Sequence, residues 1–223
     1  MAKVKDPVSG GTHALGGVAS IVGLVFLIIW AAKYGEGAVD IVSFTIFGTA
    51  LILLYTFSAL YHLLNVKEKA TRVMRKFDHI MIYVLIAASY TPILLGPLRT
   101  MGAWGWSLFG VIWGLAIAGI LLTSIWLDAP RWLTTGIYIG MGWVVVIAAV
   151  PMAEMFTSNE NGFDAFMWLL SGGLAYTIGG VIYGLKWPKI TTKYVGFHEI
   201  FHIFVMIGSF CHYWFMIRYI LNM

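Results

Sequence analysis

The chain has 223 residues, of which 60% are hydrophobic and only 11% are charged, and its formal net charge is +4. Because soluble domains carry about 25% charged residues, this composition excludes a water-soluble globule and predicts an integral membrane protein. The positive charge is then expected to reflect basic segments beside a membrane, so no nucleic-acid partner is expected.

Seven apolar segments follow one another along the chain, each close to the length of about 20 residues that a membrane-spanning helix needs. In chain order they cover residues 14–32, 41–64, 79–98, 104–127, 132–153, 164–185 and 198–219. The connectors between them are short and leave no room for a second domain. The sequence therefore predicts an all-α membrane protein, a single seven-transmembrane helix bundle over residues 1–223, with the third and fifth helices kinked at Pro92 and Pro151.

Lysine and arginine are divided unevenly between the two sides of this bundle. Of the 14 such residues, only Lys33, Arg99 and Arg218 fall on the side opposite the N-terminus. Cytoplasmic loops carry the excess of positive charge in membrane proteins. The N-terminus is therefore predicted to be cytoplasmic and the C-terminus external, in a multi-pass protein of the cell membrane.

Four ionisable residues lie where the apolar segments begin or end. His62 ends the second segment, Asp78 precedes the third, and His198 and His202 open the seventh. The alternating direction of the spans brings all four to the cytoplasmic face. His198 and His202 are four residues apart, so they stand on one helix face about 6 Å apart along the axis. Since ionisable groups at membrane depth are costly, each is a functional candidate.

Three imidazoles with an open fourth position are typical of a catalytic zinc site. We therefore predict a zinc ion bound by His62, His198 and His202. Asp78 would hold a water at the open position and accept its proton, and Ser58, one helical turn before His62, is the second candidate catalytic residue. Imidazole ligands also suit copper, iron or nickel, so the sequence indicates zinc without excluding these metals.

Purely structural interpretations of the catalytic candidates stay open. Asp78 could cap the third helix or pair with Arg75. Ser58 could bond back to the carbonyl of Leu54. The metal itself could merely link the second helix to the seventh.

Other polar residues are expected to stand apart from the metal. His13 is a candidate for supporting the site from behind its ligands, whereas His79 is turned about 100° from its neighbour and is expected to face lipid headgroups. His212 lies about 15 Å along the helix from the histidine pair and is expected to be a satisfied packing residue. The role of Glu199 is left open.

Three segments that contain these residues resemble the haemolysin III family: SALYHLL (58–64), FDHIMIYVLIAASYTP (77–92) and HEIFHIFVMIGSFCHYW (198–214). That family is the bacterial branch of the progestin and adipoQ receptor superfamily, which is related to the alkaline ceramidases. The resemblance implies zinc held by the three histidines, with a water between zinc and Asp78 and with Ser58 close by. The chain departs from the family pattern at residues 7–11, where members often have an asparagine, and at Ser89, where threonine is usual.

Three functions are compatible with this sequence. The favoured one is a zinc-dependent hydrolase of lipid amide or ester bonds, ceramidase-like, which takes a lipid or fatty-acyl substrate from the inner leaflet and acts in membrane lipid homeostasis. The second is a non-catalytic sensor or regulator of membrane state with structural zinc. The third is a pore-forming haemolysin or transporter, which is disfavoured because the polar cluster stops at one face, whereas a pathway should continue across the bilayer.

Overall fold

The computed structural model describes residues 5–190, 192 and 195–222, and within them it is helical and contains no strand. The helices are α1 (Pro7–Tyr34), α2 (Ala38–Leu63), α3 (Glu68–Leu95), η1 (Pro97–Thr100), α4 (Trp104–Ile125), α5 (Arg131–Gly142), η2 (Val144–Ala148), α6 (Ala149–Thr157), α7 (Gly162–Leu185), α8 (Phe197–Arg218) and η3 (Ile220–Asn222). Counting α5, η2 and α6 as one crossing, seven described helical segments are long and apolar enough to span a membrane. The predicted all-α, seven-transmembrane architecture is confirmed.

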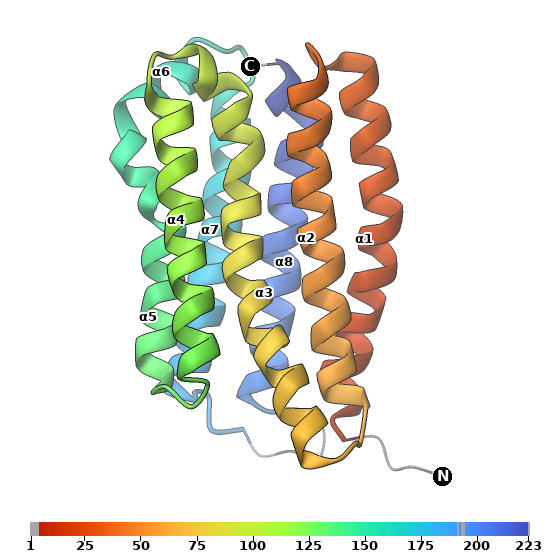
Figure 1. Ribbon diagram of the computed structural model, residues 1–223. Coiled ribbons are helices and arrows are strands. Elements are labelled where there is room, and N and C mark those ends of the chain that lie inside the picture. Colours follow the sequence, from red (N-terminus) through yellow and green to blue (C-terminus); the bar gives the residue numbers. More distant parts are fainter. Residues whose placement is uncertain (1–4, 191, 193–194, 223) are drawn as a thin grey trace.

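The spans form an upright bundle whose two termini lie at opposite ends (Figure 1). Helix α1 packs along α2, α2 along α3, and α7 along α8. Large aromatic side chains such as Phe44, Phe47 and Phe215 are fully buried in the interior. By contrast, α1 exposes Leu15, Val22 and other apolar side chains on its outer face. An exposed apolar surface of this kind is expected where lipid tails, and not water, surround the protein. Which end of the bundle faces the cytoplasm stays a prediction.

Two helices begin well before the apolar runs that identified them. Helix α1 begins at Pro7 and not near residue 14, and α3 begins at Glu68 and not near residue 79. The apolar run marks only the membrane-immersed part of a span, and strong helix formers such as glutamate, lysine, arginine and alanine extend α3 beyond it. Asp78 therefore lies inside α3, and the interpretation of Asp78 as its N-cap is wrong.

The fifth span is broken, where the sequence predicted one helix over residues 132–153 kinked at Pro151. The break falls earlier, between α5 and η2, so Pro151 lies in the first turn of α6, where its missing N–H has no intrahelical partner to lose. The hydroxyl of Tyr90 lies at the break: its hydrogen is shared between the carbonyls of Gly142 at 2.5 Å and Met141 at 3.0 Å, and its oxygen accepts from the N–H of Val145 at 3.1 Å. These bonds satisfy backbone groups that lipid could not.

Candidate metal centre

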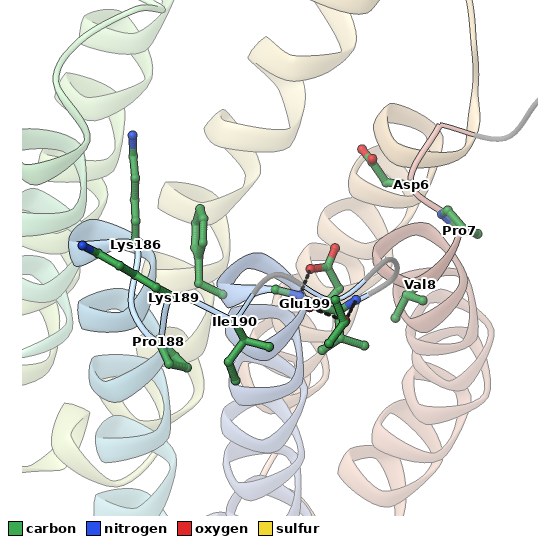
Figure 2. Close-up of a pocket in the computed structure, with 12 residues that line it drawn as sticks. Asp6, Pro7, Val8, Lys186, Pro188, Lys189, Ile190 and Glu199 are labelled. Carbon is green, nitrogen blue, oxygen red and sulfur yellow. Dashed lines mark hydrogen bonds between the residues drawn. The ribbon is translucent and has the colours of Figure 1, made fainter.

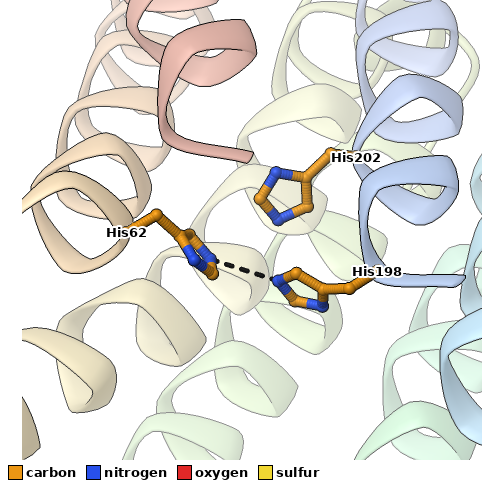
Figure 3. A group of neighbouring side chains, drawn as sticks. All are labelled: His62, His198 and His202. Atoms are coloured by element: carbon orange, nitrogen blue, oxygen red, sulfur yellow. Dashed lines mark hydrogen bonds between the residues drawn. The ribbon is translucent and has the colours of Figure 1, made fainter. Parts of the chain in front are cut away.

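Three histidines meet at the end of the bundle that holds the N-terminus. His62 lies in the last turn of α2, and His198 and His202 lie in the first two turns of α8. One nitrogen from each ring lies within 4.8 Å of the others, and the Nε2 atoms of His62 and His198 are 3.1 Å apart (Figure 3). Ligands of a tetrahedral zinc ion with bonds of about 2.0–2.1 Å lie about 3.3 Å apart. The three residues therefore converge as the topology predicted, and they are spaced for one small cation.

Asp6 stands behind this cluster. The Nδ1–H of His62 donates to the Oδ2 atom of Asp6 at 3.1 Å, and the backbone N–H of Asp6 donates to the carbonyl of His62 at 2.9 Å. A carboxylate acts only as an acceptor, so the hydrogen of the imidazole is on Nδ1 and the lone pair is on Nε2, which faces His198. Carboxylates commonly fix the tautomer and orientation of metal-binding histidines in this way. Sequence analysis missed Asp6 because it lies 56 residues from His62 with no spacing rule to connect them.

Helix α1 closes the cluster from another side. The ring of His13 stacks on the ring of His202, with centroids 3.7 Å apart and planes at 10°. Both ring nitrogens of His13 are buried without a hydrogen-bond partner in the part of the chain that the structure describes. His13 thus lies behind a candidate ligand, as the sequence suggested.

Glu199 ties the start of α8 to α1. Its Oε1 atom accepts from the hydroxyl of Ser9 at 2.7 Å, and its Oε2 atom accepts from the backbone N–H of Gly196 at 2.8 Å. The second bond caps an N–H group that the first turn of a helix leaves free. Glu199 therefore positions the turn that carries His198, which answers the question that the sequence left open.

The histidine cluster opens on a cavity of about 660 Å³ that also holds Asp78. The side chain of Asp78 is 15% exposed and lies outside the group of donor atoms described above, so the structure does not bring it among the candidate ligands. Arg75 pairs with Asp128 at 2.8 Å, so the interpretation of Asp78 as its partner is wrong. His79 lines the same cavity and donates from Nδ1 to the carbonyl of Arg75, so the expectation that it faces headgroups is wrong as well.

Ser58 lines the cavity one turn from His62. Its hydroxyl is buried and has no hydrogen-bond partner among the described residues, so the expected bond back to Leu54 is absent. A buried hydroxyl without a partner is uncommon, because leaving it unpaired costs about 1–3 kcal/mol. Ser58 thus offers a donor to a molecule that enters the cavity.

The lining of the cavity includes basic side chains at the end that holds the histidine cluster, among them Lys5, Arg75 and Arg131. The guanidinium of Arg131 lies 4.9 Å from the centre of the Tyr183 ring. A second hollow of about 520 Å³ adjoins this end (Figure 2), and Lys186 and Lys189 lie along its border. Asp6, Phe197 and Glu199 border both spaces and so separate the hollow from the histidines.

Comparison with known proteins places the chain in one family. A family model described as "Haemolysin-III related" matches residues 1–213. The chain is 40% identical to "Hemolysin-3 homolog" of Bacillus subtilis over 211 residues, which cover 94% of this chain and 92% of the relative. It is 36% identical to "Hemolysin-3" of Bacillus cereus, with 98% and 93% covered, and 26% identical to "Monocyte to macrophage differentiation factor" of Homo sapiens, with 94% and 82% covered. The chain therefore belongs to the haemolysin III family of multi-pass membrane proteins.

Proposed function

We propose that this protein is a zinc-dependent hydrolase of amide or ester bonds in membrane lipids. The observation that carries the proposal is the three-histidine cluster, with His62 and His202 buried and His198 half-buried, which borders a cavity between the helices that also contains Asp78 and Ser58. Structural zinc sites close around the ion with four protein ligands, whereas catalytic sites have three and keep one position open.

Each residue of the site has a distinct part in this chemistry. His62, His198 and His202 would hold the zinc, which when bound supplies a Lewis acid that polarises a carbonyl and lowers the pKa of water. The carboxylate of Asp78 takes a proton from the water while the water oxygen bonds to the carbonyl carbon of the lipid. Asp78 then gives this proton to the leaving nitrogen or oxygen as the amide or ester bond breaks. The hydroxyl of Ser58 donates to the carbonyl oxygen, where negative charge develops.

The shape of the cavity supports a lipid substrate. Its walls between α3 and α8 are apolar and include Leu85, Ile86 and Val205, which suit an acyl chain. Its end with the histidine cluster is basic and lies at the depth where headgroups are expected. A lipid from the inner leaflet would thus place its tail in the cavity, its headgroup at the basic end and its acyl bond beside the histidines. This placement depends on the predicted cytoplasmic orientation of that end.

A non-catalytic role with structural zinc is the second candidate. It is favoured by the fact that the three ligands come from two helices, so that one ion would fix the end of α2 to the start of α8. A pore is not proposed. Polar side chains do continue past the cluster as far as His212, which the sequence did not anticipate, but the next turn of α8 carries Phe215 and Met216, both fully buried in the interior.

The test compares zinc content with lipid turnover in the purified protein. We expect the parent to contain about one zinc and to release free fatty acid from at least one lipid in a panel of amides and esters. Asp78→Asn should keep the zinc and lose the release, whereas His198→Ala should lose both. Asp164→Asn, which changes an exposed carboxylate at the start of α7, is the matched control and should change neither. Zinc without release from any lipid by the parent would reject hydrolysis and favour the structural role.

A further inference from the structure

A second polar cluster lies deeper in the bundle, away from the histidine cluster. The hydroxyl of Tyr55 on α2 donates to the Oγ atom of Ser209 on α8 at 2.8 Å, and the hydroxyl of Tyr176 on α7 lies 2.8 Å from the same atom. The ring of His212 stands edge-on to the ring of Tyr176, with centroids 5.4 Å apart. Tyr176 and His212 both line the cavity that contains the histidine cluster. The cavity therefore has polar groups at both ends.

His212 has one satisfied nitrogen and one that lacks a partner. Its Nε2 atom lies 3.3 Å from the carbonyl of Leu169, and because a carbonyl only accepts, Nε2 carries the hydrogen. Nδ1 is therefore an acceptor, and it is buried without a hydrogen-bond partner among residues 5–190, 192 and 195–222. The expectation that His212 is a fully satisfied packing residue is wrong. His212 is 8% exposed and lines the cavity, so a molecule bound there is the available source of a donor for Nδ1.

The three hydroxyl groups leave one donor to spare. Tyr55, Ser209 and Tyr176 together carry three hydroxyl hydrogens, and the two bonds that join them use two. When Ser209 donates to Tyr176, the remaining hydrogen is on the hydroxyl of Tyr176, beside the cavity. This end of the cavity thus combines a spare donor with the free acceptor of His212. A single alcohol group, which both donates and accepts, complements that pair.

Two glycines make room for this arrangement. A Cβ atom at Gly172 would overlap the ring of His212, and one at Gly208 would lie 2.9 Å from the ring of Tyr176. Glycine inside a helix is less favourable than alanine. The two glycines therefore admit the rings of His212 and Tyr176 at a cost in helix propensity.

We propose that His212, Tyr176 and Ser209 form a second subsite that binds an alcohol group on the acyl chain of the substrate. The inference rests on the proposed function, since it assumes that the acyl bond lies at the histidine cluster. Ten residues of α8 separate His202 from His212, which is about 15 Å along the axis. An extended chain advances about 1.2 Å per bond, so the alcohol belongs about twelve carbons from the acyl carbon. The substrate class is then a lipid with a mid-chain hydroxy fatty acid.

The test measures binding of four fatty acids to the zinc-loaded protein in nanodiscs, which requires no turnover. The probes are octadecanoic acid and its 12-hydroxy, 3-hydroxy and 12-oxo derivatives. We expect 12-hydroxyoctadecanoic acid to bind about five- to tenfold more tightly than octadecanoic acid, because its hydroxyl would add one or two net hydrogen bonds. The 3-hydroxy isomer has the same composition but the wrong position, and the 12-oxo acid cannot donate to Nδ1 of His212. Both should bind less tightly than the 12-hydroxy acid.

Variants assign the preference to the subsite. His212→Phe and Tyr176→Phe keep a ring against each glycine and should reduce the preference for the 12-hydroxy acid to less than twofold, with the affinity for octadecanoic acid retained. Tyr138→Phe is the matched control, because the Tyr138 hydroxyl bonds to the carbonyl of His79 near the other end of the cavity, and it should keep the preference. If a variant fails to fold, the binding of the four acids to the parent protein still tests whether the subsite exists.

The outcomes separate this inference from the proposed function. The proposed subsite is rejected if the 12-hydroxy acid and octadecanoic acid bind equally, or if the 12-oxo acid binds more tightly than the 12-hydroxy acid. A buried water would then be the occupant of this place. Either result rejects the subsite even if fatty acid release is found. Failure of every acid to bind also overturns it. A clear 12-hydroxy preference without zinc-dependent release rejects hydrolysis and retains the cavity as a binding site for hydroxy-acyl lipids.

Discussion

Replacing Asp6 is expected to weaken zinc binding although Asp6 is not itself a ligand. The carboxylate accepts the Nδ1–H of His62 at 3.1 Å, and loss of such a partner commonly costs 10–100-fold in metal affinity. The Asp6 side chain is 41% exposed, so water screens the interaction and the lower end of that range applies. We expect about a tenfold loss for Asp6→Ala, or about 1.4 kcal/mol. Asp6→Asn keeps an acceptor without the charge, and charge-assisted bonds are about twice as strong as neutral ones, so about a threefold loss is expected.

The assay is competition for zinc between the purified protein and a chromogenic chelator at constant neutral pH. Asp164→Ala removes an exposed carboxylate elsewhere in the chain and controls for a change in overall charge. An unchanged zinc affinity in Asp6→Ala would show that His62 is not held in place by Asp6 when the metal binds, or that His62 is not a ligand. His62→Ala separates these two cases, because it abolishes binding only if His62 is a ligand.

Three further substitutions test other parts of the structure. Gly172→Ala forces a Cβ into the His212 ring, at a cost of about 1–3 kcal/mol, whereas a Cβ at Gly173 meets nothing within 4 Å. The Tm of Gly172→Ala should therefore lie about 3–9 °C below that of Gly173→Ala, and equal values would contradict the packing. Ser58→Ala should raise Tm, because it removes a buried hydroxyl that has no partner among the described residues and so costs about 1–3 kcal/mol, yet it should slow fatty acid release about 100-fold; an unchanged rate would remove Ser58 from the mechanism. Tyr90→Phe removes the hydroxyl that bonds to the backbone at the break in the fifth span and should lower the free energy of unfolding by about 1–3 kcal/mol; an unchanged Tm would show that this hydroxyl is not needed there.

The convergence of the three histidines at one end of the bundle could be predicted from the sequence. His62, His198 and His202 lie at the ends of apolar runs, and an antiparallel succession of spans leaves only two faces on which such ends can meet. The depth of a residue in the membrane is thus set by its distance in sequence from the edge of its apolar run. The rotation of each helix about its axis is not encoded in this way. His79 was therefore misplaced, since a small rotation of α3 carries it from the headgroups to the cavity wall.

Residues outside the apolar runs escaped prediction for a related reason. Asp6 lies in a short polar segment before α1, and its contact with His62 exists only because the start of α1 packs against the end of α2. The break in the fifth span also depends on another helix, because the hydroxyl of Tyr90 on α3 supplies the bonds that make the break tolerable in lipid. Both features arise from contacts between segments that are distant in sequence, which residue spacing within one segment does not report.

The class of protein, the number of spans and the end of the bundle at which the histidines meet follow from the amino-acid sequence, because the cost of placing polar groups in lipid constrains each segment separately. Which polar groups are satisfied and which remain free depends on how the helices pack against one another. Ser58 and Nδ1 of His212 lack partners among the described residues, while Glu199 and His62 have them. Whether a polar atom has a partner depends on the packing of neighbouring helices to within a fraction of an ångström. The unpaired atoms are those to which a substrate or a metal ion would bind.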